Sequence, residues 1–170
     1  MKIGIDFDNT IVNTSEVSKM FLNNYKPGNN LKSYHELSEE EEFSFFEKYY
    51  EDITNNLKIF DNVKETFNFL KENNIKIVLI TARGGNYPEI IDITKNFLIK
   101  NDLLFDEMIF GAYPKGKEAK ENNLDLVIDD TKEVIENVKE YGIKGLLYGS
   151  DVKNWQEVED YIRKEVLCQE

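Results

Sequence analysis

Cysteine, histidine and tryptophan each occur only once among the 170 residues of this chain, and proline occurs three times. The single cysteine, Cys168, excludes an intrachain disulfide and a zinc site built from several cysteines. Its place near the end of the sequence also makes it a poor candidate for a catalytic thiol. The lone His35 is expected at an exposed cap or loop position. Any chemistry must therefore rest mainly on carboxylates.

The chain also lacks a long apolar segment and a block of basic residues. No apolar run approaches the roughly 18–20 residues that a membrane-spanning helix needs. The 33 acidic and 21 basic residues give a net charge of −12, which repels a nucleic-acid backbone. Asp6 interrupts the apolar stretch that an export signal would need. We therefore expect a cytoplasmic protein that binds neither membranes nor nucleic-acid polymers, and the sequence indicates no oligomeric state.

Short apolar runs alternate with amphipathic segments along most of the chain. Such runs are typical of parallel strands that are covered on both faces and joined by crossover helices. The expected strands are residues 3–7, 75–80, 107–110, 124–128 and 143–148. This alternation predicts an α/β fold, with a Rossmann-like parallel sheet flanked by helices.

Residues 13–60 interrupt the alternation, because they contain no convincing strand. We interpret them as a small helical cap inserted after the first strand, with residues 1–12 and 61–170 forming the core. Two capping boxes, at Asn13–Glu16 and Ser38–Glu41, predict helix starts. In the second cap helix the expected buried stripe is Phe43, Phe46, Tyr50, Ile53 and Leu57. Phe45 and Tyr49 lie off this stripe and are free either to complete the core or to stack on a planar substrate group.

Two acidic pairs follow predicted strands. Asp6 and Asp8 are two residues apart, so in an extended chain their carboxylates project the same way, beyond the end of the first strand. Asp129 and Asp130 follow the fourth strand directly. Open α/β sheets bind ligands at this edge, and adjacent carboxylates repel one another unless a cation such as Mg²⁺ joins them. Either pair could instead be an ordinary acidic turn or helix start.

Other polar residues fall at the same edge. Thr81 and Arg83 follow the second strand, and Lys115 and Lys117 lie in the segment before the fourth. A hydroxyl and a cation are suited to compensating the charge on phosphoryl oxygens. Each residue alone has a plainer explanation as a surface group.

Taken in order, the motifs Asp6-Phe7-Asp8-Asn9-Thr10, Thr81, a lysine and Asp129-Asp130 resemble the four motifs of the haloacid dehalogenase (HAD) superfamily of phosphohydrolases. The resemblance implies that Asp6 is the nucleophile and Asp8 the general acid and base. It implies that Thr81 and Lys117 hold the phosphoryl group, with Lys115 as the second choice of lysine. It also implies a Mg²⁺ site formed by Asp6, the Asp8 carbonyl, Asp129 and Asp130. Asn9 replaces a glycine found in many relatives, and asparagine tolerates the same turn.

Within the superfamily the chain resembles the 5'(3')-deoxyribonucleotidase-like group, through Thr81-Ala82-Arg83, Ile128-Asp129-Asp130 and, loosely, Trp155. This favours a small phosphorylated substrate such as a nucleoside 5'-monophosphate, with Thr10, Arg83 and Tyr49 as substrate contacts. A sugar or other small phosphate is the alternative substrate. A receiver switch has its motifs in a different order, a dehalogenase would not need Asp8, and a non-catalytic binding protein would not need both Asp6 and Asp8.

Overall fold

A computed structural model describes residues 1–165, so Cys168 lies outside the described residues. In chain order the elements are β1 (Lys2–Ile5), α1 (Thr14–Tyr25), the short 3-10 helix η1 (Tyr34–Glu36), α2 (Glu39–Asn56), α3 (Val63–Glu72), β2 (Lys76–Ile80), α4 (Glu89–Lys100), β3 (Glu107–Ile109), α5 (Gly116–Glu121), β4 (Leu126–Asp129), α6 (Lys132–Glu140), β5 (Lys144–Leu147) and α7 (Trp155–Glu165). Within the described part, no helix combines the length and the apolar character that crossing a membrane requires.

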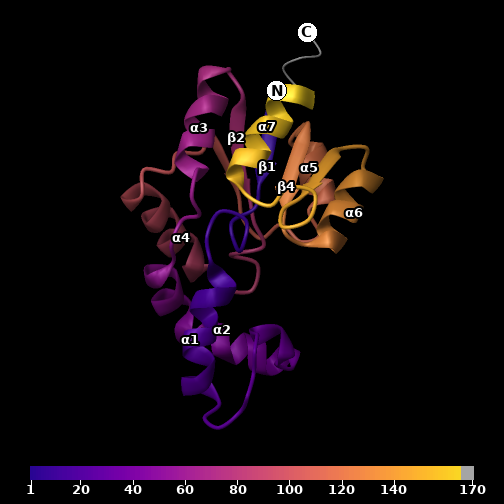
Figure 1. The fold of residues 1–170 in the computed structure, drawn as a ribbon. Helices are drawn as coiled ribbons and strands as arrows, with labels where there is room; N and C mark the ends of the chain where they lie inside the picture. Colours follow the sequence, from indigo (N-terminus) through magenta and orange to yellow (C-terminus); the bar gives the residue numbers. More distant parts are fainter. Residues whose placement is uncertain (166–170) are drawn as a thin grey trace.

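The five strands form one parallel sheet in the order β3-β2-β1-β4-β5, which confirms the α/β prediction (Figure 1). Alternate strand residues supply two separate apolar clusters, because successive side chains point to opposite faces. Ile3 and Ile5 pack in one cluster with side chains of α3, α4 and α7. Val78 and Val127 pack in the other with side chains of α5 and α6. Strand β1 therefore lies in the middle of a sheet covered on both faces.

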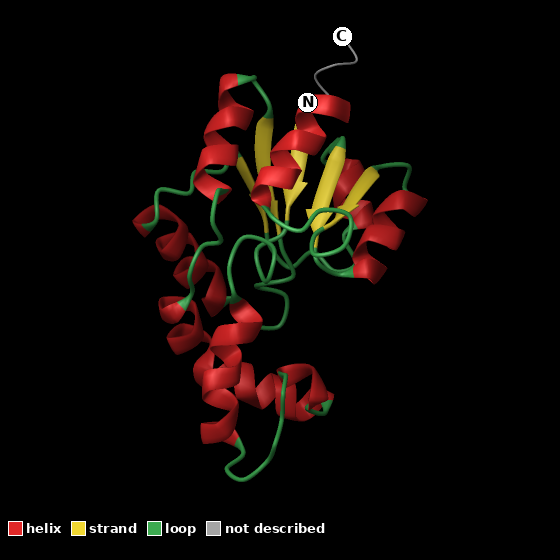
Figure 2. Ribbon diagram, viewed as in Figure 1, coloured by secondary structure: helices red, strands yellow, loops and turns green. Residues whose placement is uncertain are grey.

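Helices α1 and α2 extend away from the carboxyl ends of the strands, and α2 also packs against α4 (Figures 1 and 2). The chain enters and leaves this cap side by side: the Phe60 N–H donates to the Ile11 carbonyl at 2.9 Å, and the Asn13 N–H donates to the Lys58 carbonyl at 3.2 Å. The cap is thereby attached next to the loop that follows β1. That loop contains Asp6 and Asp8.

Both cap helices begin where the sequence predicts, α1 after Asn13 and α2 after Ser38, but of these two starts only that of α2 forms the predicted capping box. Ser38 and Glu41 form the expected capping box. Asn13 accepts no capping hydrogen bond from the first turn of α1. Its side-chain oxygen instead accepts from the Lys58 N–H at 2.8 Å. Asn13 thus joins the two cap connections, a contact between distant residues that a local pattern does not show.

The predicted buried stripe of α2 is confirmed at Ile53 and Leu57, which are buried, and is wrong at Phe43. Phe45 is fully buried, whereas Phe43 is 45% exposed. Phe45 packs against Tyr25 of α1, and Tyr49 packs against Phe21 and Phe45. The helix has two apolar sides, one facing α1 and one facing the sheet, so helical spacing alone could not tell which side forms the cap interior.

Candidate active site

Three buried charges meet where β1, β4 and the start of α5 come together. Asp6 follows β1 and its N–H donates to the Ile128 carbonyl of β4 at 3.0 Å. Lys115 precedes α5, and its Nζ donates to Asp129 Oδ2 at 2.6 Å and to Asp6 Oδ1. All three are nearly inaccessible, with Lys115 2% and Asp129 1% exposed. The sheet thus presents a nucleophile candidate, a cation and a second acid in one small region.

The cation at this position is Lys115, which corrects the choice of Lys117. Lys117 lies on the exposed side of α5, where its Nζ is 3.8 Å from Glu121 Oε1. The position is determined by Gly116, whose N–H donates to Asn137 Oδ1 at 2.8 Å as α5 packs against α6. A side chain at residue 116 would meet the Asn137 carbonyl at 2.8 Å from its Cβ, so this close approach needs glycine. Motif spacing could not distinguish two lysines that flank one glycine.

Burial and crowding determine the ionisation of these groups. Burial, together with the charge of Asp129, raises the pKa of Asp6 to about 8, although Lys115 acts in the opposite direction. Burial alone would lower the pKa of Lys115, but Asp6 and Asp129 raise it overall. Burial and Asp129 raise the pKa of Asp130 to about 6. The site therefore holds more carboxylates than one lysine can neutralise.

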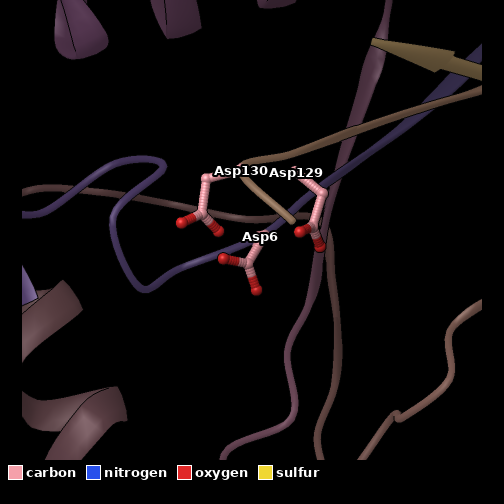
Figure 3. Close-up of side chains that lie close together, drawn as sticks. All are labelled: Asp6, Asp129 and Asp130. Carbon is pink, nitrogen blue, oxygen red and sulfur yellow. The ribbon is translucent and has the colours of Figure 1, made fainter. Parts of the chain in front are cut away.

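The carboxylates of Asp6, Asp129 and Asp130 converge, with one oxygen of each within 4.8 Å of the others (Figure 3). Asp130 accepts a long hydrogen bond of 3.4 Å from the Thr131 hydroxyl. Hard carboxylate oxygens in such a group are the ligands that Mg²⁺ prefers. The donor set and its excess negative charge therefore fit a divalent cation.

Asp8 is held by a two-point ion pair with Arg83. Arg83 Nε donates to Asp8 Oδ2 at 2.8 Å and Nη2 donates to Oδ1 at 2.7 Å, while the Thr14 hydroxyl donates to Oδ1 at 2.5 Å. Burial by itself would raise the pKa of Asp8, but Arg83 lowers it overall. Both carboxylate oxygens accept hydrogen bonds in this arrangement, which leaves the Asp8 carbonyl as the group that the sequence resemblance assigns to a metal.

Arg83 is buried and joins three parts of the chain. Besides its bonds to Asp8, its Nη1 donates to the Thr54 hydroxyl of α2 at 2.9 Å and to the Thr94 hydroxyl of α4 at 3.1 Å. It is 9% exposed and its guanidinium lies 4.4 Å from the Phe7 ring centre. The guanidinium thus positions Asp8 and links the cap to the core. A contact between Arg83 and substrate, expected from the sequence, stays a prediction.

Two threonines support the site in different ways. The Thr10 hydroxyl donates to Asp6 Oδ2 at 3.2 Å, and the Thr10 carbonyl accepts from the Trp155 indole at 2.8 Å. Thr10 is completely buried and lies outside the cavity lining, so it orients Asp6 instead of reaching the substrate as expected. Thr81 is 1% exposed and lines the cavity. The turn between Asp8 and Thr10 has Asn9 at φ +57°, the left-handed region that asparagine tolerates.

A cavity of about 440 Å³ lies between these residues and the cap. Phe46 and Tyr50 line it from α2, Tyr34 from η1, and Tyr87 from the loop before α4. Tyr49, the aromatic residue expected to contact substrate, is absent from the lining and packs inside the cap, 5.4 Å from Phe21 between ring centres. The correction follows from the orientation of α2, which points Phe46 and Tyr50 at the sheet.

Some site residues were missed from the sequence. Thr54 and Thr94 belong to no recognisable motif. Both accept hydrogen bonds from Arg83, and this role depends on the position that the guanidinium takes in the folded protein. Phe46 and Tyr50 had the right spacing for one helix face, but they were assigned to the buried core. The sequence shows aromatic residues on two sides of α2, which could have suggested that one side lines a site. This pattern does not tell which of the two sides faces the sheet.

No protein-family model and no curated protein matches this sequence. Solved structures share its fold: a protein described as a predicted phosphatase from Clostridium acetobutylicum is 15% identical with a TM-score of 0.70, and the match covers 96% of this chain and 98% of that chain. A HAD-superfamily hydrolase from Ehrlichia chaffeensis is 18% identical with a TM-score of 0.63, and the match covers 96% of both chains. A protein described as a predicted phosphoglycolate phosphatase from Haemophilus somnus is 17% identical with a TM-score of 0.63, covering 93% of this chain and 96% of that chain.

Identities this low establish the fold alone, and that fold is the one of HAD-superfamily hydrolases. None of these three descriptions names a nucleotidase, so the resemblance to the 5'(3')-deoxyribonucleotidase-like group is not supported.

Proposed function

From a fold shared with HAD-superfamily hydrolases, we propose that this protein is a Mg²⁺-dependent phosphomonoester hydrolase that acts through an aspartyl phosphate. The observation that carries the proposal is the meeting of Asp6, Lys115 and Asp129 at one end of a cavity that they line together with Asp8. Phosphoryl transfer needs a nucleophile and compensation of oxygen charge; Asp6 supports the first requirement, and Lys115 with a cation held by the carboxylates supports the second. The sequence order of the motifs supports the same chemistry.

In the first step a carboxylate oxygen of Asp6 attacks the phosphorus, and the bond to the leaving oxygen breaks. Asp8 donates a proton to that oxygen. In the second step water attacks the phosphorus of the aspartyl phosphate, Asp8 takes the proton of the water, and the phosphorus–Asp6 bond breaks to release inorganic phosphate. Lys115 stays close to Asp6 throughout and faces the phosphoryl oxygens, with Thr81 beside the cavity.

Asp6, Asp129 and Asp130, with the Asp8 carbonyl, would hold the Mg²⁺. When bound, the ion supplies positive charge that offsets both the carboxylates and the phosphoryl oxygens. Arg83 keeps Asp8 in place during both proton transfers. Thr10 orients the attacking carboxylate of Asp6.

For the leaving group, the rings of Phe46 and Tyr50 support a nucleoside 5'-monophosphate, since flat bases stack on aromatic side chains. The likeness to a structure described as a phosphoglycolate phosphatase supports a small non-nucleotide phosphate as the second candidate. The cavity of about 440 Å³ is of the size of small-molecule sites.

Phosphate release from a panel of monoesters tests the proposal, with and without Mg²⁺. We expect turnover that chelation abolishes and added Mg²⁺ restores. Purified Asp6→Asn protein is the control for a contaminating phosphatase. Turnover by the wild type that is independent of any divalent cation would contradict the metal requirement, and no turnover of any monoester would contradict the proposal as a whole.

A further inference from the structure

The charges around the cavity are unbalanced. Its lining includes five acidic residues, namely Asp6, Asp8, Glu42, Asp129 and Asp130. Among residues 1–165, the lining contains one arginine, Arg83, and one lysine, Lys115. Both already form ion pairs with carboxylates. A leaving group with a second phosphate or a carboxylate would find no uncommitted lysine or arginine there. Such a group would also face repulsion from the acids.

Glu42 is the acid of this lining that the proposed chemistry does not use. It lies in the first turn of α2, on the cap side of the cavity, and is half-buried. Across the described part of the chain, its carboxylate makes no hydrogen bond or ion pair with another side chain. Burial and Glu39 raise the pKa of Glu42, and the exposed His35 nearby lowers it. A carboxylate in this position is available to a ligand.

Aromatic rings line the same end of the cavity as Glu42. They are Tyr34, Phe46, Tyr50 and Tyr87. The Tyr34 and Phe46 rings are 5.0 Å apart and nearly perpendicular, and the Tyr50 and Tyr87 rings are 6.4 Å apart and nearly parallel. The Tyr87 hydroxyl donates to the Phe43 carbonyl of the cap at 2.5 Å, which holds a core ring against α2. This end of the cavity therefore has aromatic walls, and the rings are held in place by contacts within the cap and between the cap and the core.

Aromatic faces attract cations, and a carboxylate binds N–H donors with charge-assisted hydrogen bonds. We propose that Glu42 and these rings select a leaving group that carries nitrogen, as a positive charge or as amino N–H donors, and that carries no second anion. This inference rests on the proposed phosphatase function and names its substrate class. The nitrogen can come from an alkylammonium group or from an amino-substituted nucleobase, since both present the same chemistry to Glu42.

Three esters of similar size test the selection by charge: 2-aminoethyl phosphate, 2-hydroxyethyl phosphate and phosphoglycolate. We expect kcat/KM to be highest for the amine and lowest for the carboxylate, with about a tenfold step between amine and alcohol, as one charge-assisted contact gives. Cytidine and uridine 5'-monophosphates form the second arm, because they differ in one amino group. A preference confined to one arm identifies the source of the nitrogen.

Glu42→Gln and Glu42→Lys assign the preference to this residue. We expect the amine-to-alcohol ratio of kcat/KM to fall to near one in Glu42→Gln, and the carboxylate ester to become the better substrate in Glu42→Lys. Glu39→Gln is the matched control, because Glu39 is an exposed acid of the same helix outside the cavity lining, and its ratios should equal those of the wild type. Equal kcat/KM within both arms in the wild type, or a preference that survives Glu42→Gln, would overturn the inference.

Binding separates this inference from the proposed function. Calorimetry of the same esters with Asp6→Asn protein reports recognition without turnover. If the amine ester binds tightest and Glu42→Gln in that background removes the difference, the selection stands even where hydrolysis is absent. If hydrolysis occurs but neither binding nor kcat/KM depends on the charge of the ester, the result supports the proposed phosphatase function and contradicts the selection by Glu42.

Discussion

The two sides of the cavity hold their side chains in different ways. On the core side, Lys115, Asp129 and Thr81 are at most 2% exposed, and the charged groups are bonded to one another. On the cap side, Phe46 and Tyr50 are only partly buried. Parallel strands determine the positions of Asp129 and Thr81 through backbone hydrogen bonds, whereas the cap presents its rings from α2 and η1. The core is therefore built for a chemistry that tolerates little displacement, and the cap for choosing among leaving groups.

Removal of the nucleophile should have the largest effect on the core side. We expect Asp6→Asn to lower kcat by more than roughly 10⁴-fold, because the attacking oxygen is lost. The fold should persist, since asparagine has the same size and Asp6 already has a raised pKa. Phosphate release and circular dichroism measure the two effects. Near wild-type hydrolysis by the purified variant would disprove the mechanism.

Replacing the buried lysine should damage both activity and stability. We expect Lys115→Ala to leave Asp6 and Asp129 as uncompensated neighbours and to cost about 3–5 kcal/mol of unfolding free energy in the metal-free protein. Its kcat should fall as well. Lys117→Ala is the matched control, and it should change stability by no more than about 0.5 kcal/mol because Lys117 is exposed. Chemical denaturation and kinetics compare the two; a greater loss of kcat in Lys117→Ala would restore the original choice of lysine.

Asp8→Asn should be less severe than loss of the nucleophile. It removes proton transfer, which typically contributes about 10²–10⁴-fold, but it keeps the attacking oxygen. We expect slow turnover and an accumulated phosphoenzyme, detectable by intact-protein mass spectrometry after acid quench. In the phosphorylation step, followed as the rate of phosphoenzyme formation, the loss should be smaller for an aryl phosphate, because a phenolate leaves without needing a proton. An equal loss in that rate for aryl and alkyl esters would argue that Asp8 has a purely structural role.

Two neighbouring tyrosines of α2 should separate the cap's binding side from its packing side. We expect Tyr50→Ala to raise KM for the preferred ester several-fold with little change in the melting temperature. Tyr49→Ala should lower the melting temperature, because Tyr49 packs against Phe21 and Phe45. Thermal denaturation and KM measured on both variants give the comparison. The same KM change in both would mean that the two sides of α2 do not divide these tasks.

The smallest effect concerns pH in the metal-free protein. Asp6 and Asp130 have folded-state pKa values raised to about 8 and about 6, above that of an unfolded aspartate, so the folded state binds more protons. Their stabilising contribution is complete below about pH 4 and is lost as the pH rises to about 8. We expect the melting temperature in EDTA to fall by several degrees from pH 5 to pH 8. Added Mg²⁺ and the Asp6→Asn variant should each make the melting temperature less dependent on pH. If neither changes the pH dependence, its cause is the net charge of the protein and not Asp6 and Asp130.

The sequence predicted the fold well because its signals were local. Short apolar runs identified the five strands to within two residues at their ends, and the runs are clearest for β1, β2 and β4, which are buried on both faces. The alternation with helices then implied a parallel sheet. The Ser38 capping box marked the start of α2 through contacts within four residues.

The sequence by itself determined which chemical groups would gather at the carboxyl edge of the sheet, because Asp6, Thr81 and Asp129 each come at or just after the end of a strand. Only the tertiary structure decided which of two lysines joins them, which side of α2 faces the sheet, and that the Arg83 guanidinium ends on Asp8. Each of these depends on how a helix is rotated or how far a long side chain reaches. The packing of distant elements sets both, and no pattern of neighbouring residues encodes it.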